Sequence, residues 1–123
     1  MLLVDAANVV GSRPDGWWHD RAGAARRLVE QVRAATASSR LDGPVVVVLE
    51  GAARCGVEEG AAHGVEVVHA PAAGDDTLVA LAAAAPEPVV LVSADRALGA
   101  RGRAAGAAVV GPRWLLDRLG LPP

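Results

Sequence analysis

The sequence predicts a three-layer α/β/α sandwich built on a mostly parallel five-stranded sheet, a Rossmann-like fold class. Two observations carry this prediction. Short apolar runs alternate along the chain with segments of helical periodicity, and the connections between them are short. Strands and helices that alternate in this way form a parallel sheet with right-handed crossovers and helices on both faces. The 123 residues fit one domain that spans 1–123.

The first strand is predicted at residues 1–6, and residues 8–16 are expected to form a loop that closes at the turn signal Pro14-Asp15-Gly16. Residues 18–37 are expected to form an amphipathic helix, because apolar side chains recur there at helical spacing. These side chains are Ala25, Leu28, Val29, Val32 and Ala35, and charged residues occupy the opposite face. The helix should therefore lie with its apolar side on the sheet.

The middle of the chain predicts two further strands. Residues 45–49 form a continuous β-branched run, which is typical of a strand covered on both faces and indicates a central position. Residues 52–62 should carry a helical turn or two, and residues 65–69 are the third predicted strand.

The last part of the chain repeats the alternation. Residues 77–85 are apolar nearly all round and follow two aspartates directly, which predicts a buried helix. A fourth strand is expected at 89–92, a short helix at 96–105, and a fifth strand at 107–110. Residues 112–119 should form a closing helix with a proline in its first turn, where proline is well tolerated.

Composition excludes several classes of function. All twelve basic residues are arginine, so the lysine of a phosphate-binding P-loop or of a Schiff-base enzyme is missing. The net charge of −2 argues against a protein that coats nucleic acid by bulk charge. Cys55 has no partner for a disulfide or a thiolate metal site, and no apolar stretch approaches the ~20 residues of a membrane span. We therefore expect a cytoplasmic protein without membrane segments.

Carboxylates follow two predicted strands and open one predicted helix at the same edge of the predicted sheet. Asp5 ends the first strand, Asp75 and Asp76 open a helix, and Asp95 follows the fourth strand. The carboxyl ends of parallel strands meet in one crevice, so these acids should converge and would repel one another unless a hard cation neutralised them. The alternative is local, since each aspartate could cap a turn or a helix. We favour a shared Mg²⁺ or Mn²⁺ site.

Other residues have weaker assignments. Glu50 ends the second strand and could be an outer-shell acid of the metal site or a solvated strand end. Arg96 could reach a substrate phosphate or be an ordinary surface arginine. Trp17 and Trp18 could stack bases, although at least one is expected to pack the helix start onto the core. No pair of histidines has zinc-motif spacing and no serine lies in a nucleophile elbow, which removes zinc chemistry and serine hydrolysis.

Four motifs, read in order, resemble the PIN-like nuclease superfamily and most of all its NYN branch. They are Leu3-Val4-Asp5-Ala6-Ala7-Asn8, Leu49-Glu50-Gly51, Gly74-Asp75-Asp76-Thr77-Leu78-Val79 and Leu91-Val92-Ser93-Ala94-Asp95-Arg96-Ala97-Leu98. The resemblance covers nearly the whole chain and implies a single PIN/NYN-like domain. Each motif is short, and their order and spacing together make the resemblance moderately specific.

The resemblance implies roles for individual residues. Asp5, Asp76 and Asp95 match the catalytic metal ligands, Asp75 matches a neighbouring acid of the metal site, and Asn8 and Ser93 match polar groups that would position the substrate. Apart from the resemblance, Arg96 is expected to position the substrate because it directly follows Asp95. The chain departs from related nucleases at two positions. Glu50 stands where they tend to have Asp, and Ala97 stands where they often have a further Asp, so one metal would bind tightly and a second would arrive with substrate.

The implied function is phosphodiester hydrolysis by a metal-dependent ribonuclease, in which the cation activates water and stabilises the leaving oxygen. RNA is the expected partner, other nucleic acids or nucleotides remain open, and so does a homodimer. Two alternatives stand beside it: hydrolysis of a small phosphorylated compound such as a nucleoside triphosphate, and a PIN-like module that only binds. An extended groove flanked by Arg13, Arg21, Arg54, Arg96 and Arg101 would favour nucleic acid, and a closed pocket would favour a small substrate.

Overall fold

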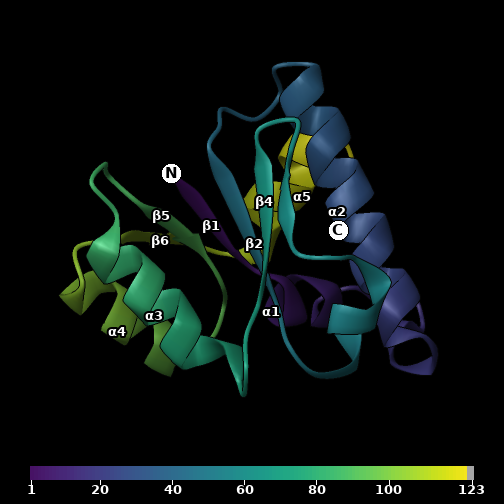
Figure 1. Ribbon diagram of the computed structural model, residues 1–123, viewed down its shortest axis with the longest axis horizontal. Helices are drawn as coiled ribbons and strands as arrows, with labels where there is room; N and C mark the ends of the chain where they lie inside the picture. Colours follow the sequence, from purple (N-terminus) through teal and green to yellow (C-terminus); the bar gives the residue numbers. More distant parts are fainter. Residues whose placement is uncertain (122–123) are drawn as a thin grey trace.

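The computed structural model describes residues 1–121 and confirms the predicted fold class. Six strands form one sheet, with α1, α2 and α5 on one face and α3 and α4 on the other (Figure 1). The strands are β1 (Leu2–Asp5), β2 (Val45–Leu49), β3 (Gly60–Ala62), β4 (Val65–His69), β5 (Val90–Val92) and β6 (Ala108–Val110). The helices are α1 (Ala6–Gly11), η1 (Trp17–His19), α2 (Arg21–Ala37), η2 (Gly51–Gly56), α3 (Gly74–Ala84), α4 (Arg96–Ala104) and α5 (Pro112–Leu119).

The strand order is β3-β4-β2-β1-β5-β6, and every pair is parallel except β3 with β4. From β1 the chain moves outward to β2 and β4 on one side, and it later returns to the other side of β1 as β5. The strand order therefore reverses between β1 and β5. In open α/β sheets this reversal leaves a crevice beyond the carboxyl ends of the two strands, where ligands bind.

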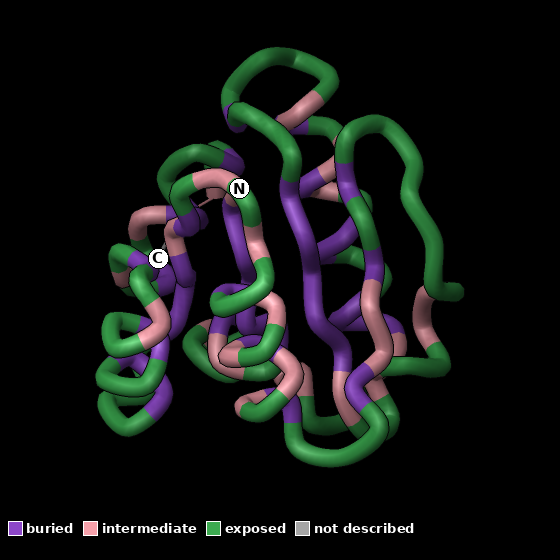
Figure 2. The backbone as a smooth tube through the Cα atoms, turned by 60° about the vertical axis from the view of Figure 1, so that its left-hand side comes forward, coloured by how far each residue is buried: buried purple, intermediate pink, exposed green. Residues whose placement is uncertain are grey.

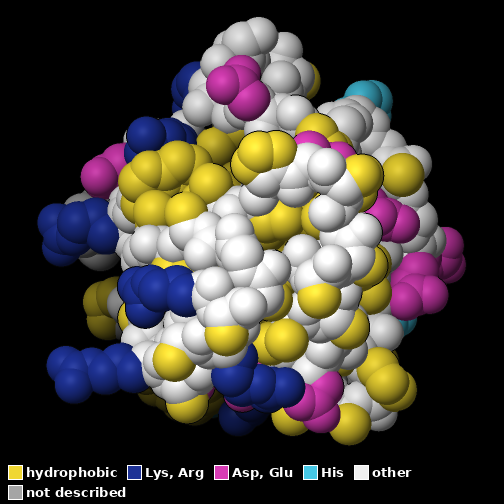
Figure 3. Space-filling view, turned by 90° about the vertical axis from the view of Figure 1, so that its left-hand side faces the viewer, with side chains coloured by type: hydrophobic (Ala, Val, Ile, Leu, Met, Phe, Trp, Pro, Cys, Tyr) yellow, Lys and Arg dark blue, Asp and Glu magenta, His cyan; other side chains and the backbone are white. Residues whose placement is uncertain are grey.

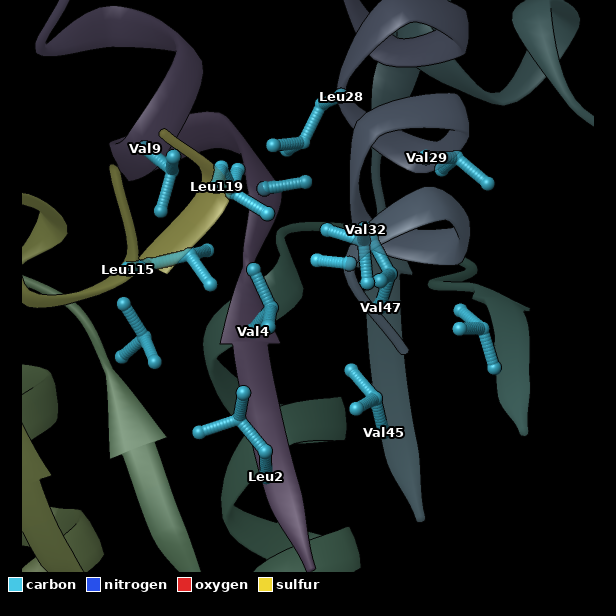
Figure 4. Packing of buried hydrophobic residues seen from close by; sticks show 14 of the residues in the cluster. Leu2, Val4, Val9, Leu28, Val29, Val32, Val45, Val47, Leu115 and Leu119 are labelled. Atoms are coloured by element: carbon cyan, nitrogen blue, oxygen red, sulfur yellow. The ribbon is translucent and has the colours of Figure 1, made fainter. Parts of the chain in front are cut away.

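Two apolar layers hold the helices to the sheet. On one face, side chains of β1 and β2 pack against α1, α2 and α5 (Figure 4). The residues labelled there are Leu2, Val4, Val9, Leu28, Val29, Val32, Val45, Val47, Leu115 and Leu119. On the other face, Leu3, Val46 and Leu91 pack against Leu78 of α3 and Leu98 of α4. The central strands β1 and β2 are buried, while β3 at the edge of the sheet and most connections are exposed (Figure 2).

Helix α1 occupies part of the segment that was predicted to be a loop. The Asp5 side chain accepts a hydrogen bond from the Asn8 amide at 3.4 Å and so caps the helix. Ala6 and Val9, three residues apart, are both buried. The helix forms because Val9 reaches the core from it, and a six-residue helix has too few turns to give a periodic signal in the sequence.

Two helix starts and one additional strand also differ from expectation. The long helix begins at Arg21, because the Asp20 carboxylate caps it through the Gly23 amide at 2.8 Å. The extra strand β3 pairs with β4 through a tight turn at His63 and Gly64, which both have positive φ. Helix α3 begins at Gly74, three residues earlier than expected, so its first turn contains both aspartates. In the described part of the chain, no helix is long and apolar enough to cross a membrane.

Candidate functional site

Asp5 is the buried acid of the crevice. It ends β1, beside the β5 strand that marks the reversal of the sheet, and only 7% of its surface is exposed. One carboxylate oxygen accepts a hydrogen bond from the Ser93 hydroxyl at 2.8 Å, and the other accepts the weaker bond from the Asn8 amide. The carboxylate is therefore held in one orientation from both sides.

Asn8 and Ser93 join the loops that follow β1 and β5. The Asn8 side-chain oxygen accepts a hydrogen bond from the Ala94 amide at 2.7 Å. The Ser93 hydroxyl oxygen accepts one from the Asp95 amide at 3.1 Å while its hydrogen is donated to Asp5. The bonds from Asn8 to Ala94 and from Ser93 to Asp5 connect residues far apart in sequence, so both polar side chains help to fix the geometry of the rim around the Asp5 carboxylate. The sequence predicted that Asn8 and Ser93 would position the substrate.

Burial raises the pKa of the Asp5 carboxyl above its ordinary value of 3.8. The hydrogen bonds from Ser93 and Asn8 act in the opposite direction, because they favour the charged form. The negative charges of Asp75 and Glu50 raise the pKa further. Asp5, Asp75 and Glu50 therefore make one negatively charged neighbourhood, and within residues 1–121 no cationic side chain forms an ion pair with Asp5.

Asp76 has a different environment from Asp75. Its side chain is 89% exposed and accepts a hydrogen bond from the Arg101 guanidinium at 2.8 Å, across the gap between α3 and α4. Consecutive residues of an α-helix project about 100° apart, so the two aspartates leave α3 in different directions. The structure therefore pairs Asp76 with Arg101, and the acid of α3 whose charge reaches Asp5 is Asp75.

Glu50 and Asp95 hold helix starts at the rim. One oxygen of Glu50 accepts a hydrogen bond from the Gly74 amide at 3.1 Å, where α3 begins. Asp95 is exposed and caps α4 by accepting from the Leu98 amide at 3.0 Å, which is the local role considered as the alternative. Arg96 is exposed at the first position of the same helix.

The predicted acids do not form one compact group. Among residues 1–121, no three His, Cys, Asp or Glu side chains are arranged to hold a single metal ion. The structure brings together Asp5, Asn8 and Ser93 by hydrogen bonds and surrounds them with Asp75 and Glu50. The sequence indicated all five positions but not which of the two adjacent aspartates faces inward.

A cavity of about 330 Å³ adjoins this acidic neighbourhood. Glu50 lines it, together with Trp17, Arg21 and small side chains from α1 and η2. The Arg21 guanidinium lies over the Trp17 ring, 5.0 Å from the ring centre. The sequence did not predict the cavity, because part of its wall is the helix α1, a segment that was expected to be mostly loop.

Positive charge does not form a continuous band over α3 and α4. On that face the arginines stand as separate groups among uncharged atoms (Figure 3). One of them, Arg101, is engaged by Asp76. Arg54, on the other side of the molecule, donates to the carbonyl oxygens of Gly51 and Ala70. The groove flanked by arginines that would favour long nucleic acid is therefore absent from the face seen there.

No family model and no curated protein matches the chain. Among solved structures it is similar to two of Rae1 (YacP) from Bacillus subtilis. One superposes with a TM-score of 0.69 at 23% identity, covering 98% of this chain and 73% of that chain. The other, a tryptophan-to-leucine mutant of the same protein, has a TM-score of 0.68 at 23% identity, covering 97% of this chain and 73% of that chain. At this level of identity the similarity supports the fold alone.

Proposed function

We propose that the protein is a PIN/NYN-like, metal-dependent phosphodiester hydrolase, with single-stranded RNA as the substrate we favour. One observation carries the proposal. A carboxylate is buried at the sheet reversal, oriented by two polar side chains, and faced by two further acids instead of a cation. Such an arrangement raises the free energy of the folded protein and is retained where a ligand supplies the missing charge.

The side chains present fit a hard divalent cation. Carboxylate, amide and hydroxyl oxygens are the ligands that Mg²⁺ and Mn²⁺ prefer, and no thiolate or imidazole stands among them. Asp5 and Asp75 are the residues that would hold the ion, with Glu50 contributing from the outer shell. Asp95 uses one oxygen, Oδ1, as a helix cap and is proposed as a further acid of the same rim. Asp76 is not included, because Arg101 engages it.

The chain itself would mainly orient the reactants. A bound cation would supply Lewis acidity, which lowers the pKa of water and stabilises negative charge on phosphate oxygens. The Ser93 hydroxyl and the Asn8 backbone N–H favour the ionised form of the Asp5 carboxylate and fix its orientation, so that little rearrangement is needed when an ion binds. Arg96, exposed at the start of α4, is proposed to meet a substrate phosphate at the rim.

A second candidate function is hydrolysis of a small phosphorylated compound such as a nucleoside triphosphate. The cavity beside the acids favours it, because about 330 Å³ lies at the lower end of the range for small-ligand sites. The absence of a basic band on the α3/α4 face and the net charge of −2 point the same way. A cytoplasmic location is proposed for either activity, because the single cysteine, Cys55, is an exposed free thiol.

Turnover should be measured with short RNA, single-stranded DNA and nucleoside triphosphates while Mg²⁺ or Mn²⁺ is titrated. The variants to compare are Asp5→Asn, Asp95→Asn and the adjacent pair Asp75→Asn and Asp76→Asn. The proposal expects metal-dependent turnover that is lost in Asp5→Asn and Asp75→Asn and retained in Asp76→Asn. Turnover that survives both Asp5→Asn and Asp95→Asn would contradict a carboxylate metal site. A metal effect on neither turnover nor thermal stability would leave a PIN-like binding module.

A further inference from the structure

We infer that the cavity beside Glu50 binds one unstacked base of a single-stranded nucleic acid. The inference rests on the proposed function, since the cavity shares Glu50 with the acidic neighbourhood around Asp5. A nucleotide whose phosphate reaches those acids would have its base within reach of the cavity. The site therefore adds a base contact to a centre that otherwise recognises phosphate.

The cavity walls suit a flat, largely apolar group with polar edges. Most of the lining is apolar and comes from small residues, Ala6, Ala7 and Val10 of α1 and Ala52 and Ala53 of η2. Small side chains leave room for a ring where larger ones would fill the space. The volume of about 330 Å³ accommodates a single nucleotide and excludes a base-paired duplex, whose bases are already stacked and paired.

Trp17 and Arg21 supply the stacking surface. The guanidinium of Arg21 lies over the indole of Trp17, and both side chains line the cavity. Bases stack on aromatic rings and on arginine planes alike, and the arginine also adds positive charge for the adjoining phosphate. Trp18 provides an internal comparison, because it is the next residue, is 55% exposed, and is not part of the cavity wall.

Glu50, at the edge of the cavity, also suits a nucleic-acid base. Glu50 donates no hydrogen bond when ionised, and one of its two oxygens accepts from the Gly74 amide. Its carboxylate suits the amino and imino hydrogens that bases present along their edges. A purely apolar ligand would instead leave the second Glu50 oxygen without a partner, so the polar rim argues for a base over a hydrocarbon chain.

The test is equilibrium binding of fluorophore-labelled hexanucleotides in EDTA. Because EDTA prevents metal-dependent cleavage, base binding is measured separately from the proposed hydrolysis. Single-stranded RNA, single-stranded DNA, duplex RNA and an abasic hexamer of the same charge are compared. We expect single strands to bind at least fivefold more tightly than the duplex or the abasic strand. Equal binding of the abasic strand would overturn the inference, because the phosphates alone would then account for affinity.

The matching variants are Trp17→Leu, Ala7→Leu and, as the control, Trp18→Leu. Loss of one stacking contact should weaken single-strand binding by about 5- to 100-fold in Trp17→Leu. Ala7→Leu fills the cavity from an exposed helix position without removing the tryptophan, and a similar loss is expected. Trp18→Leu should change affinity by less than about twofold, and thermal melts report whether each variant is folded. Unchanged binding in Trp17→Leu and Ala7→Leu, or equal loss in Trp18→Leu, would contradict a base site.

Discussion

Replacing Asp5 by asparagine should make the metal-free protein more stable and abolish its response to metal. The substitution removes a buried charge and its repulsion by Asp75 and Glu50, while an amide oxygen can still accept from Ser93. A single stabilising substitution typically raises the free energy of unfolding by about 0.5–2 kcal/mol, and we expect this range for Asp5→Asn. With about 2.1 cal/mol/K of unfolding entropy per residue over 123 residues, 1 kcal/mol corresponds to about 4 °C in Tm. The metal-free variant should therefore melt about 2–8 °C above the native protein.

In the presence of metal, the native protein should instead melt at a higher temperature than Asp5→Asn. A divalent ion present at a hundred times its Kd stabilises the native protein by about 2.7 kcal/mol, or about 10 °C in Tm for a chain of this length. Asp5→Asn lacks the central ligand and should gain almost nothing. The two melting temperatures should therefore cross as Mg²⁺ or Mn²⁺ replaces EDTA. Thermal unfolding followed by circular dichroism at pH 7, with and without metal, measures both effects.

The pH dependence of stability independently checks whether Asp5→Asn stabilises the metal-free protein. Because folding raises the pKa of Asp5, the folded state holds the proton more tightly than the unfolded state does. The resulting stability is present below the ordinary carboxyl pKa of 3.8 and is lost as the pH rises through the folded value. The advantage of Asp5→Asn should accordingly vanish near pH 3 and be complete at neutral pH. A variant that is less stable than the native protein in EDTA at pH 7 would refute this reasoning.

Three further predictions use neighbouring positions. Asp75→Asn should lose most of the metal-dependent rise in Tm, and Asp76→Asn should keep it. Asp76→Asn should also change the stability of the metal-free protein little, because the exposed ion pair that it removes contributes only about 0–1 kcal/mol. Ser93→Ala should lower the free energy of unfolding by about 1–3 kcal/mol. It should also shift the acidic limb of metal-dependent stabilisation to higher pH, because the carboxylate loses the donor that favours its charged form. Gly102→Ala should be about 1–3 kcal/mol less stable than Gly99→Ala in urea unfolding, because a Cβ at the former lies 2.8 Å from a buried leucine carbon and at the latter only makes ordinary contacts.

Each of these predictions has a contrary outcome. A loss of metal response in Asp76→Asn equal to that in Asp75→Asn would mean that the helix presents both carboxylates to one site. An unchanged pH limb in Ser93→Ala would show that its hydroxyl does not influence the buried acid. Equal stabilities of the two glycine variants would show that Leu91 moves aside at little cost, since it is the side chain that a Cβ at Gly102 meets.

Much of the architecture was predictable because strong local patterns specify it. The valine run of β2, the β4 strand and the proline-initiated helix α5 have the predicted bounds, since burial on both faces and a proline at the first turn leave clear signals. Short elements were not predictable. Helix α1 and strand β3 depend on contacts with distant parts of the fold, and neither is long enough to be periodic.

The sequence by itself determined the order of strands and helices and the rim on which the acids stand, because both follow from hydrophobic periodicity and from the positions where strands end. Only the tertiary structure decided which carboxylates share one environment. Asp75 and Asp76 are equivalent as neighbours in sequence, and the phase of α3 turns one toward Asp5 and leaves the other to Arg101. That phase is set by packing Leu78 and Ala82 of α3 against the sheet, which no local pattern around the two aspartates specifies.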